Sequence, residues 1–259
     1  MNSNYDKVKI VVVGDSGVGK TSLVHLIAHQ EVLKKPNWTI GCSVDVKLHE
    51  FKDGTPQHKT CFIEFFDIGG NLGHRSSAKM FLSGADGIIL VHDLTNRKSQ
   101  ENLHQWIADV MEQNEKVSVG TSDYHYESKQ SPGKKTTSKN SSFFYQDNSN
   151  LLPLIFVGTK LDQAQIVRNS NSFRNQSQIA LMYRADEINL DCMQPNYLAP
   201  ATSNSIKLAK FFDKVFENKF AITNLKSNYY SIQTEKPKTN DLFNTNINTN
   251  SRIYANKIK

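Results

Sequence analysis

One short stretch of the sequence has the residue types and the spacing needed to hold phosphate groups. Residues 14–21 read Gly-Asp-Ser-Gly-Val-Gly-Lys-Thr and satisfy the pattern G-x-x-x-x-G-K-[ST]. Glycines let successive backbone N–H groups turn inward around phosphates, and a helix that begins after the turn adds its positive end. Lys20 is expected to reach the β- and γ-phosphates of a nucleotide, and the Thr21 hydroxyl to ligate Mg²⁺. The predicted nucleotide-binding residues of this stretch are Asp15, Ser16, Gly17, Val18, Gly19, Lys20, Thr21 and Ser22.

The alternative is an ordinary glycine-rich turn, and the flanking sequence argues against it. Residues 8–13 form a run that is β-branched except at Lys9, which is typical of a parallel strand covered on both faces. Residues 20–29 have a helical pattern, with Leu23, Leu26 and Ile27 on one side. A phosphate site of this kind requires a strand that leads through glycines into a helix.

The elements that must position this stretch alternate between strand and helix. Residues 44–51 and 60–67 predict an antiparallel hairpin, because the turn signal Lys-Asp-Gly-Thr-Pro separates them. Residues 87–92, 154–158 and 188–192 predict short buried strands. Residues 103–111 and 205–220 predict amphipathic helices. The order predicts an α/β fold with a mostly parallel six-stranded sheet and helices on both faces.

A second motif follows the predicted strand 154–158 and reads Thr159-Lys160-Leu161-Asp162. With it the chain resembles the small GTPases of the Ras superfamily, in which an [NT]-K-x-D motif after the fifth strand reads guanine. The resemblance implies the P-loop fold of a small G domain, which binds GTP and GDP. It also implies that the Asp162 carboxylate accepts hydrogen bonds from guanine N1–H and the N2 amino group, a donor pair that adenine lacks. The aliphatic stem of Lys160 would lie along the base and ribose.

Residues 80–96, Met-Phe-Leu-Ser-Gly-Ala-Asp-Gly-Ile-Ile-Leu-Val-His-Asp-Leu-Thr-Asn, are similar to Rab proteins in particular. Thr39 lies in a segment that resembles the Rab switch I, so its hydroxyl would reach Mg²⁺ and its backbone N–H the γ-phosphate. Residues 67–71, Asp-Ile-Gly-Gly-Asn, stand where the family has D-T-A-G-Q. By that resemblance Asp67 would hold a Mg²⁺-bound water, and the Gly70 amide would face the γ-phosphate.

Three departures from the family pattern bear on mechanism. Asn71 replaces the glutamine that orients the attacking water, and its amide is one methylene shorter, which predicts weak catalysis. Val32 stands near the position where the family has an aromatic residue beside guanine. Cys192 and Met193, followed by glutamine, occupy the place of the loop that supports the base. The second and third departures predict loose nucleotide binding.

Composition limits the other classes of function. The formal net charge of +6 lies mostly in residues 223–259, where six basic residues accompany two acidic ones, so no basic footprint for nucleic acid falls on the fold. Three scattered cysteines favour a reducing compartment and a cytoplasmic location. The absence of a cysteine after Cys192 predicts that the protein has no prenyl anchor and no stable membrane attachment.

Two segments lack the apolar periodicity of packed elements. Residues 113–150 are rich in Ser, Lys, Asn and Thr, and residues 223–259 are basic and rich in Asn. We expect a G domain over residues 1–222 that contains a mobile insert at about 113–150, and a disordered tail over 223–259.

Three functions fit these patterns. The first is a GTP-binding switch with Mg²⁺, slow hydrolysis and rapid exchange that regulates protein effectors. The second is a GTP-bound homodimeric scaffold that acts alongside prenylated small GTPases and their chaperones without a hydrolysis cycle. The third is a small-molecule nucleotide kinase, which is disfavoured because the insert contains no arginine for an acceptor-binding lid.

Overall fold

The computed structural model describes residues 6–71, 73, 75–114, 152–167 and 177–234. It contains two units, Met1–Ala221 and Ile222–Lys259. The first unit holds the sheet and all of the predicted site residues. The second is described for residues 222–234, which are helical.

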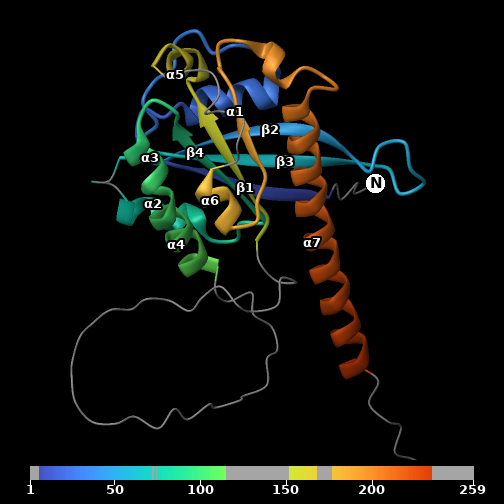
Figure 1. Ribbon diagram of the computed structural model, residues 1–259. Coiled ribbons are helices and arrows are strands. Elements are labelled where there is room, and N and C mark those ends of the chain that lie inside the picture. The colour runs from blue at the N-terminus through green and yellow to red at the C-terminus, as the bar shows by residue number, and fades with distance from the viewer. Residues whose placement is uncertain (1–5, 72, 74, 115–151, 168–176, 235–259) are drawn as a thin grey trace, which may run out of the picture. The chain divides into compact units, whose positions relative to one another are not determined.

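A six-stranded sheet forms the centre of the first unit, as predicted (Figure 1). Its order is β2-β3-β1-β4-β5-β6, and every neighbouring pair is parallel except the β2–β3 hairpin. The strands are β1 (Lys7–Val13), β2 (Cys42–Phe51), β3 (Lys59–Ile68), β4 (Gly87–Asp93), β5 (Leu154–Thr159) and β6 (Glu187–Asn189).

Helices cover both faces of this sheet, because its central strands are apolar on both sides. Val8, Ile10 and Val12 of β1 pack in one cluster with helices α1 (Lys20–His29) and α7 (Ser203–Thr234). Val11 and Val13 pack in another with α2 (Arg75–Leu82), α4 (Leu103–Asn114) and α6 (Gln178–Met182). The short helices α3 (Arg97–Glu101) and α5 (Leu161–Val167) follow β4 and β5.

The bounds of several predicted elements differ in the structure. The last strand covers Glu187–Asn189 instead of residues 188–192. Helix α4 continues to Asn114, whose buried side chain donates to the carbonyls of Leu82 and Val110 and so fixes the helix end where the insert was expected to begin. The remaining insert residues, 115–150, lie outside the described residues.

The closing helix also runs beyond its predicted end at residue 220. Helix α7 continues to Thr234, so the predicted disordered tail is wrong for residues 223–234. No glycine or proline interrupts residues 203–234, and nothing there stops a helix. The rest of the predicted tail lies outside the described residues. None of the helices in the described ranges is long and apolar enough to cross a membrane.

Candidate nucleotide-binding site

The predicted phosphate loop joins the end of β1 to the start of α1. Gly14, Gly17 and Gly19 have φ angles of 150°, 76° and 95°, which favour glycine. At Gly14 the requirement is also steric, because a Cβ there would lie 2.1 Å from the carbonyl oxygen of Val91 in β4. The loop therefore crosses closely over the carboxyl end of the sheet, where ligands of parallel α/β folds bind.

Lys20 lies inside this loop. Its ammonium donates to the carbonyl oxygens of Gly14 and Asp15, each at 2.9 Å, and the residue is 6% exposed. Burial lowers the pKa of Lys20 to about 8, although the carboxylates of Asp67 and Asp15 oppose this shift. The loop thus holds a desolvated cation that is suited to phosphate oxygens.

Three predicted metal-site residues meet beside Lys20, and they come from separate elements. The Thr21 hydroxyl donates to Asp67 Oδ2 at 2.6 Å, and the Thr39 hydroxyl donates to the same oxygen at 3.0 Å. The two hydroxyl oxygens are 2.9 Å apart. The structure thus brings Thr21, Thr39 and Asp67 together at one point, and their role in holding a metal stays a prediction.

Asp67 is fully buried, and burial raises its pKa despite the hydrogen bond from Thr21 and the charge of Lys20. Its Oδ1 is buried without a hydrogen-bond partner among the described residues. An unpartnered carboxylate oxygen next to two hydroxyls is a hard, oxygen-only donor set, and such a set fits Mg²⁺. Ser43, which was not predicted, also donates to Asp67 Oδ2 at 3.4 Å, because it is opposite Asp67 in the β2–β3 register.

Gly69 and Gly70 connect β3 to the loop. The Gly69 N–H donates to the carbonyl oxygen of Gly41 at 2.8 Å. A Cβ on Gly70 would lie 2.4 Å from the carbonyl carbon of Asp15, so only glycine lets this backbone pack against the phosphate loop. Gly70 therefore lies beside the predicted phosphate site.

Asn71 is exposed, and its side-chain oxygen accepts a hydrogen bond from the Gly73 N–H at 2.9 Å. The predicted catalytic amide is therefore engaged in a turn of its own segment.

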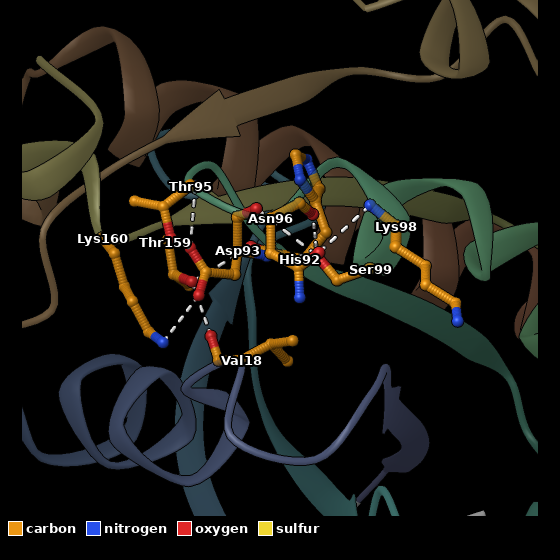
Figure 2. A network of polar contacts seen from close by, with 9 residues as sticks. All are labelled: Val18, His92, Asp93, Thr95, Asn96, Lys98, Ser99, Thr159 and Lys160. Carbon is orange, nitrogen blue, oxygen red and sulfur yellow. Dashed lines mark hydrogen bonds and ion pairs between the residues drawn. The ribbon is translucent and has the colours of Figure 1, made fainter. Parts of the chain in front are cut away.

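The second motif joins β5 to the phosphate loop (Figure 2). The buried Thr159 hydroxyl donates to the carbonyl oxygen of Val18 at 2.5 Å and lies 3.0 Å from that of His92. Thr159 therefore links the loop to the ends of two adjacent strands. This contact explains the position of the motif immediately after β5.

Lys160 is held by an acid that was not predicted. Its ammonium is 2.6 Å from Asp93 Oδ2, and its φ of 56° is in the left-handed region. Burial raises the pKa of Asp93, but the bonds from Lys160 and Thr95 outweigh burial and hold this pKa below its usual range. The register places Asp93 opposite Thr159, and this pairing could have indicated the contact.

The remaining predicted residues lie at the same end of the sheet. Asp162 is exposed in the first turn of α5. Burial raises the pKa of Cys192 to about 12, and the charges of Asp191 and Asp162 add to this shift. The Met193 N–H donates to Asp191 Oδ1 at 2.8 Å, and Met193 is 58% exposed.

Comparison with known proteins agrees with this arrangement. Residues 9–121 match the family model "Roc: Ras of Complex, Roc, domain of DAPkinase". The chain is 43% identical to Rab-like protein 3 of Bos taurus over 225 residues, which cover 84% of this chain and 88% of that protein. Identity to the Homo sapiens Rab-like protein 3 is 42% with the same coverage. Small GTPase LIP1 of Arabidopsis thaliana is 38% identical over 114 residues, 40% of this chain and 33% of that protein.

Proposed function

Because this chain belongs to the Rab-like small GTPases, a family that binds GTP and GDP, we propose that it is a Mg²⁺-dependent molecular switch that regulates protein partners. The observation that carries the proposal is the convergence of Thr21, Thr39 and Asp67. Thr39 precedes β2 and Asp67 lies near the end of β3, so a ligand at the phosphate loop would act on both segments at once. Ordering of such segments by the γ-phosphate is how nucleotide state is transmitted.

In this proposal the hydroxyls of Thr21 and Thr39 would hold Mg²⁺, and Asp67 would hold a water bound to it. The metal, when bound, neutralises charge on the β- and γ-phosphate oxygens. Lys20 contributes the second positive charge, since its ammonium already lies within the loop. Asp162 would read guanine, while Asp93 keeps the Lys160 side chain in a fixed direction beside it.

Hydrolysis is proposed to be slow and nucleotide retention loose. Asn71 is exposed and bonds within its own turn, so little in its surroundings directs it to an attacking water. Val32 and the partly exposed Met193 offer guanine less aromatic and backbone support than the family pattern. The first feature favours slow hydrolysis, and the second favours ready exchange of nucleotide.

The surface next to Thr39 supports a role in binding proteins. Trp38 and Ile40, which flank Thr39 in the chain, are 86% and 90% exposed. Val44, Val46 and Leu48 point to solvent from β2, an edge strand of the sheet. Large apolar side chains gathered beside a nucleotide-sensitive residue suit partner recognition. The expected partners are protein effectors or regulators, with other small GTPases and their chaperones among the candidates.

A second candidate is a GTP-bound homodimeric scaffold without a hydrolysis cycle. Asn71 in place of glutamine favours it, because the reaction that would end the GTP state lacks its water-orienting group. The two candidates differ in single-turnover hydrolysis with and without cell extract. Extract should accelerate hydrolysis by a switch and leave the rate of the scaffold unchanged.

Hydrogen–deuterium exchange tests the switch directly. Protein loaded with a non-hydrolysable GTP analogue should show slower amide exchange at Thr39 and Gly70 than protein loaded with GDP, both with Mg²⁺ present. The amides of Ile89 and Val157, buried in the central sheet, serve as internal controls and should not differ. Equal amide exchange at Thr39 and Gly70 in the two nucleotide states would contradict the switch and leave the GTP-bound scaffold as the remaining candidate.

A further inference from the structure

Asp15 is an acidic residue in a loop that must bind negatively charged phosphates, and its side chain has a specific pair of partners. Asn102 Nδ2 donates to Asp15 Oδ2 at 2.7 Å, and the indole N–H of Trp106 donates to Asp15 Oδ1 at 3.1 Å. Within the described ranges no cation pairs with this carboxylate. Both oxygens are therefore bonded by neutral groups, one just before α4 and one in its first turn, which leaves the backbone of the loop for the ligand.

Trp106 has a second contact, with the helix that follows the Gly69–Gly70 segment. The guanidinium carbon of Arg75 in α2 lies 4.7 Å from the centroid of the Trp106 ring. Arg75 Nε also donates to Asp109, which is one turn further along α4 and nearly buried. A cation over an indole face is attracted to it, and burial strengthens the attraction. Trp106 is itself 1% exposed, so the indole has little room to turn.

Asp15 is thus contacted from two sides. Gly70 packs on its backbone, and Trp106 bonds its side chain. Gly70 and Arg75 are only five residues apart, and Arg75 rests on Trp106. The phosphate loop therefore contacts Gly70 and α4 directly, and α4 in turn contacts α2.

We propose that Trp106 is a positioning residue that fixes the phosphate loop through Asp15 and couples it to α2 through Arg75. This inference rests on the proposed function, since it concerns retention of the same nucleotide. Its consequence is that a displacement of α2, by nucleotide exchange or by a partner, moves the indole and loosens the loop. Nucleotide dissociation is then set partly by a side chain that does not touch the nucleotide.

A double-mutant cycle tests the bond between Trp106 and Asp15. Trp106→Phe keeps an aromatic ring under Arg75 and removes the N–H donor, while Asp15→Ala removes the acceptor. Each change should speed release of a fluorescent GDP analogue roughly tenfold, the scale of one hydrogen bond to a charged group. The double variant should release no faster than the faster single variant. An unchanged rate in Trp106→Phe, or multiplied effects in the double variant, would overturn the inference.

Ile107→Ala is the matched control. Ile107 is buried on α4 next to Trp106, and the change weakens the same core without removing a bond to Asp15. The effects of Ile107→Ala and Asp15→Ala on the rate of GDP release should multiply when the two changes are combined. Should Trp106→Phe fail to fold, Asn102→Asp replaces it, because a second carboxylate facing Asp15 Oδ2 should also accelerate release.

Trp106 fluorescence tests the link to α2. The chain has two tryptophans, so Trp38→Phe leaves Trp106 as the sole emitter. Its emission should differ between the GDP state and the state with a non-hydrolysable GTP analogue, and Arg75→Leu should abolish the difference. Identical emission in both states would overturn the coupling. If the parent chain failed to bind guanine nucleotides at all, the proposed function would fail first, and the two failures are thus distinguishable.

Discussion

The Lys160 ammonium lies 2.6 Å from Asp93 Oδ2, although 67 residues separate the two in the chain (Figure 2). Asp93 ends β4 and is opposite Thr159, the last residue of β5, so the parallel register alone brings the pair together. Thr95 donates to the other carboxylate oxygen through both its N–H, at 2.8 Å, and its hydroxyl, at 2.6 Å. The acid is fixed before any ligand arrives, and it directs the lysine of the guanine motif.

Asp93→Asn should therefore weaken GDP binding. The change leaves an acceptor for Thr95 but removes the charge that holds Lys160. We expect a loss of about fivefold in affinity, near 1 kcal/mol, because the Lys160 side chain is about a third exposed and solvent screens the pair. Titration calorimetry measures the affinity for GDP, and Lys98→Met is the control for the loss of a nearby exposed charge. Equal affinity of the wild type and Asp93→Asn would show that Lys160 needs no partner.

Base choice depends on Asp162. GTP and GDP should bind far better than ATP, since a polar group that a bound base covers and leaves unpaired costs about 1–3 kcal/mol. Asp162→Asn should shift the preference toward xanthine nucleotides, because the amide donates where the carboxylate accepted. Competition binding with GDP, XDP and ADP measures the order of preference among the three bases. Equal binding of ATP and GTP to the wild type would end the guanine assignment.

The parts of the site that could be predicted from sequence are those that one continuous segment specifies. The loop around Lys20 is such a part, because its glycines and the strand and helix beside it are local features. Ser43 and Asp93 were missed, since their contacts follow from the register between strands, which the motifs alone do not specify. The bond from Trp106 to Asp15 depends on how α4 packs, and no periodicity reveals that.

The existence of the helices and strands could be predicted better than the residues at which they end, and the reason is physical. Helix α7 continues to Thr234 through a polar stretch, because the absence of glycine and proline matters more to a backbone helix than an amphipathic pattern does. The last strand is only three residues long, since the chain bends at Asp191, whose side chain accepts the Met193 N–H. Side-chain bonds of this kind compete with strand pairing.

Hydrolysis should respond to the length of the amide at position 71. The intrinsic rate of the wild type should be at or below that of ordinary small GTPases, roughly 10⁻⁴ s⁻¹. Asn71→Gln extends the amide by one methylene beyond the local turn and should raise the rate. Asn71→Ala should leave it unchanged, because the shorter amide contributes little. Phosphate release in single-turnover assays measures the three proteins, and an unchanged rate in Asn71→Gln would mean that another feature limits the reaction.

Nucleotide affinity should fall as the pH rises above about 8. Burial lowers the pKa of Lys20 to about 8 in the free protein, so its ammonium loses a proton above that pH. Phosphates favour the charged form, and binding must then restore the proton. Affinity should decrease by up to about tenfold per pH unit above the pKa. Lys20→Met should bind more weakly at pH 7 and lack this slope between pH 7 and 9.5. A wild-type slope no steeper than that of Lys20→Met would contradict the lowered pKa.

Release of GDP should be much faster than from a typical Rab protein, so that GTP could load the protein with little help from an exchange factor. Val32, partly buried after α1, supplies no aromatic edge for guanine, and Met193 is 58% exposed. Losses of contact act mainly on the dissociation rate, because association rates vary little among related complexes. Val32→Phe should slow release of a fluorescent GDP analogue in stopped-flow experiments. Val46→Phe, which adds an aromatic ring on exposed β2, should not. Release over many hours from the wild type with Mg²⁺ present would refute the loose pocket and indicate a conventional switch that depends on an exchange factor.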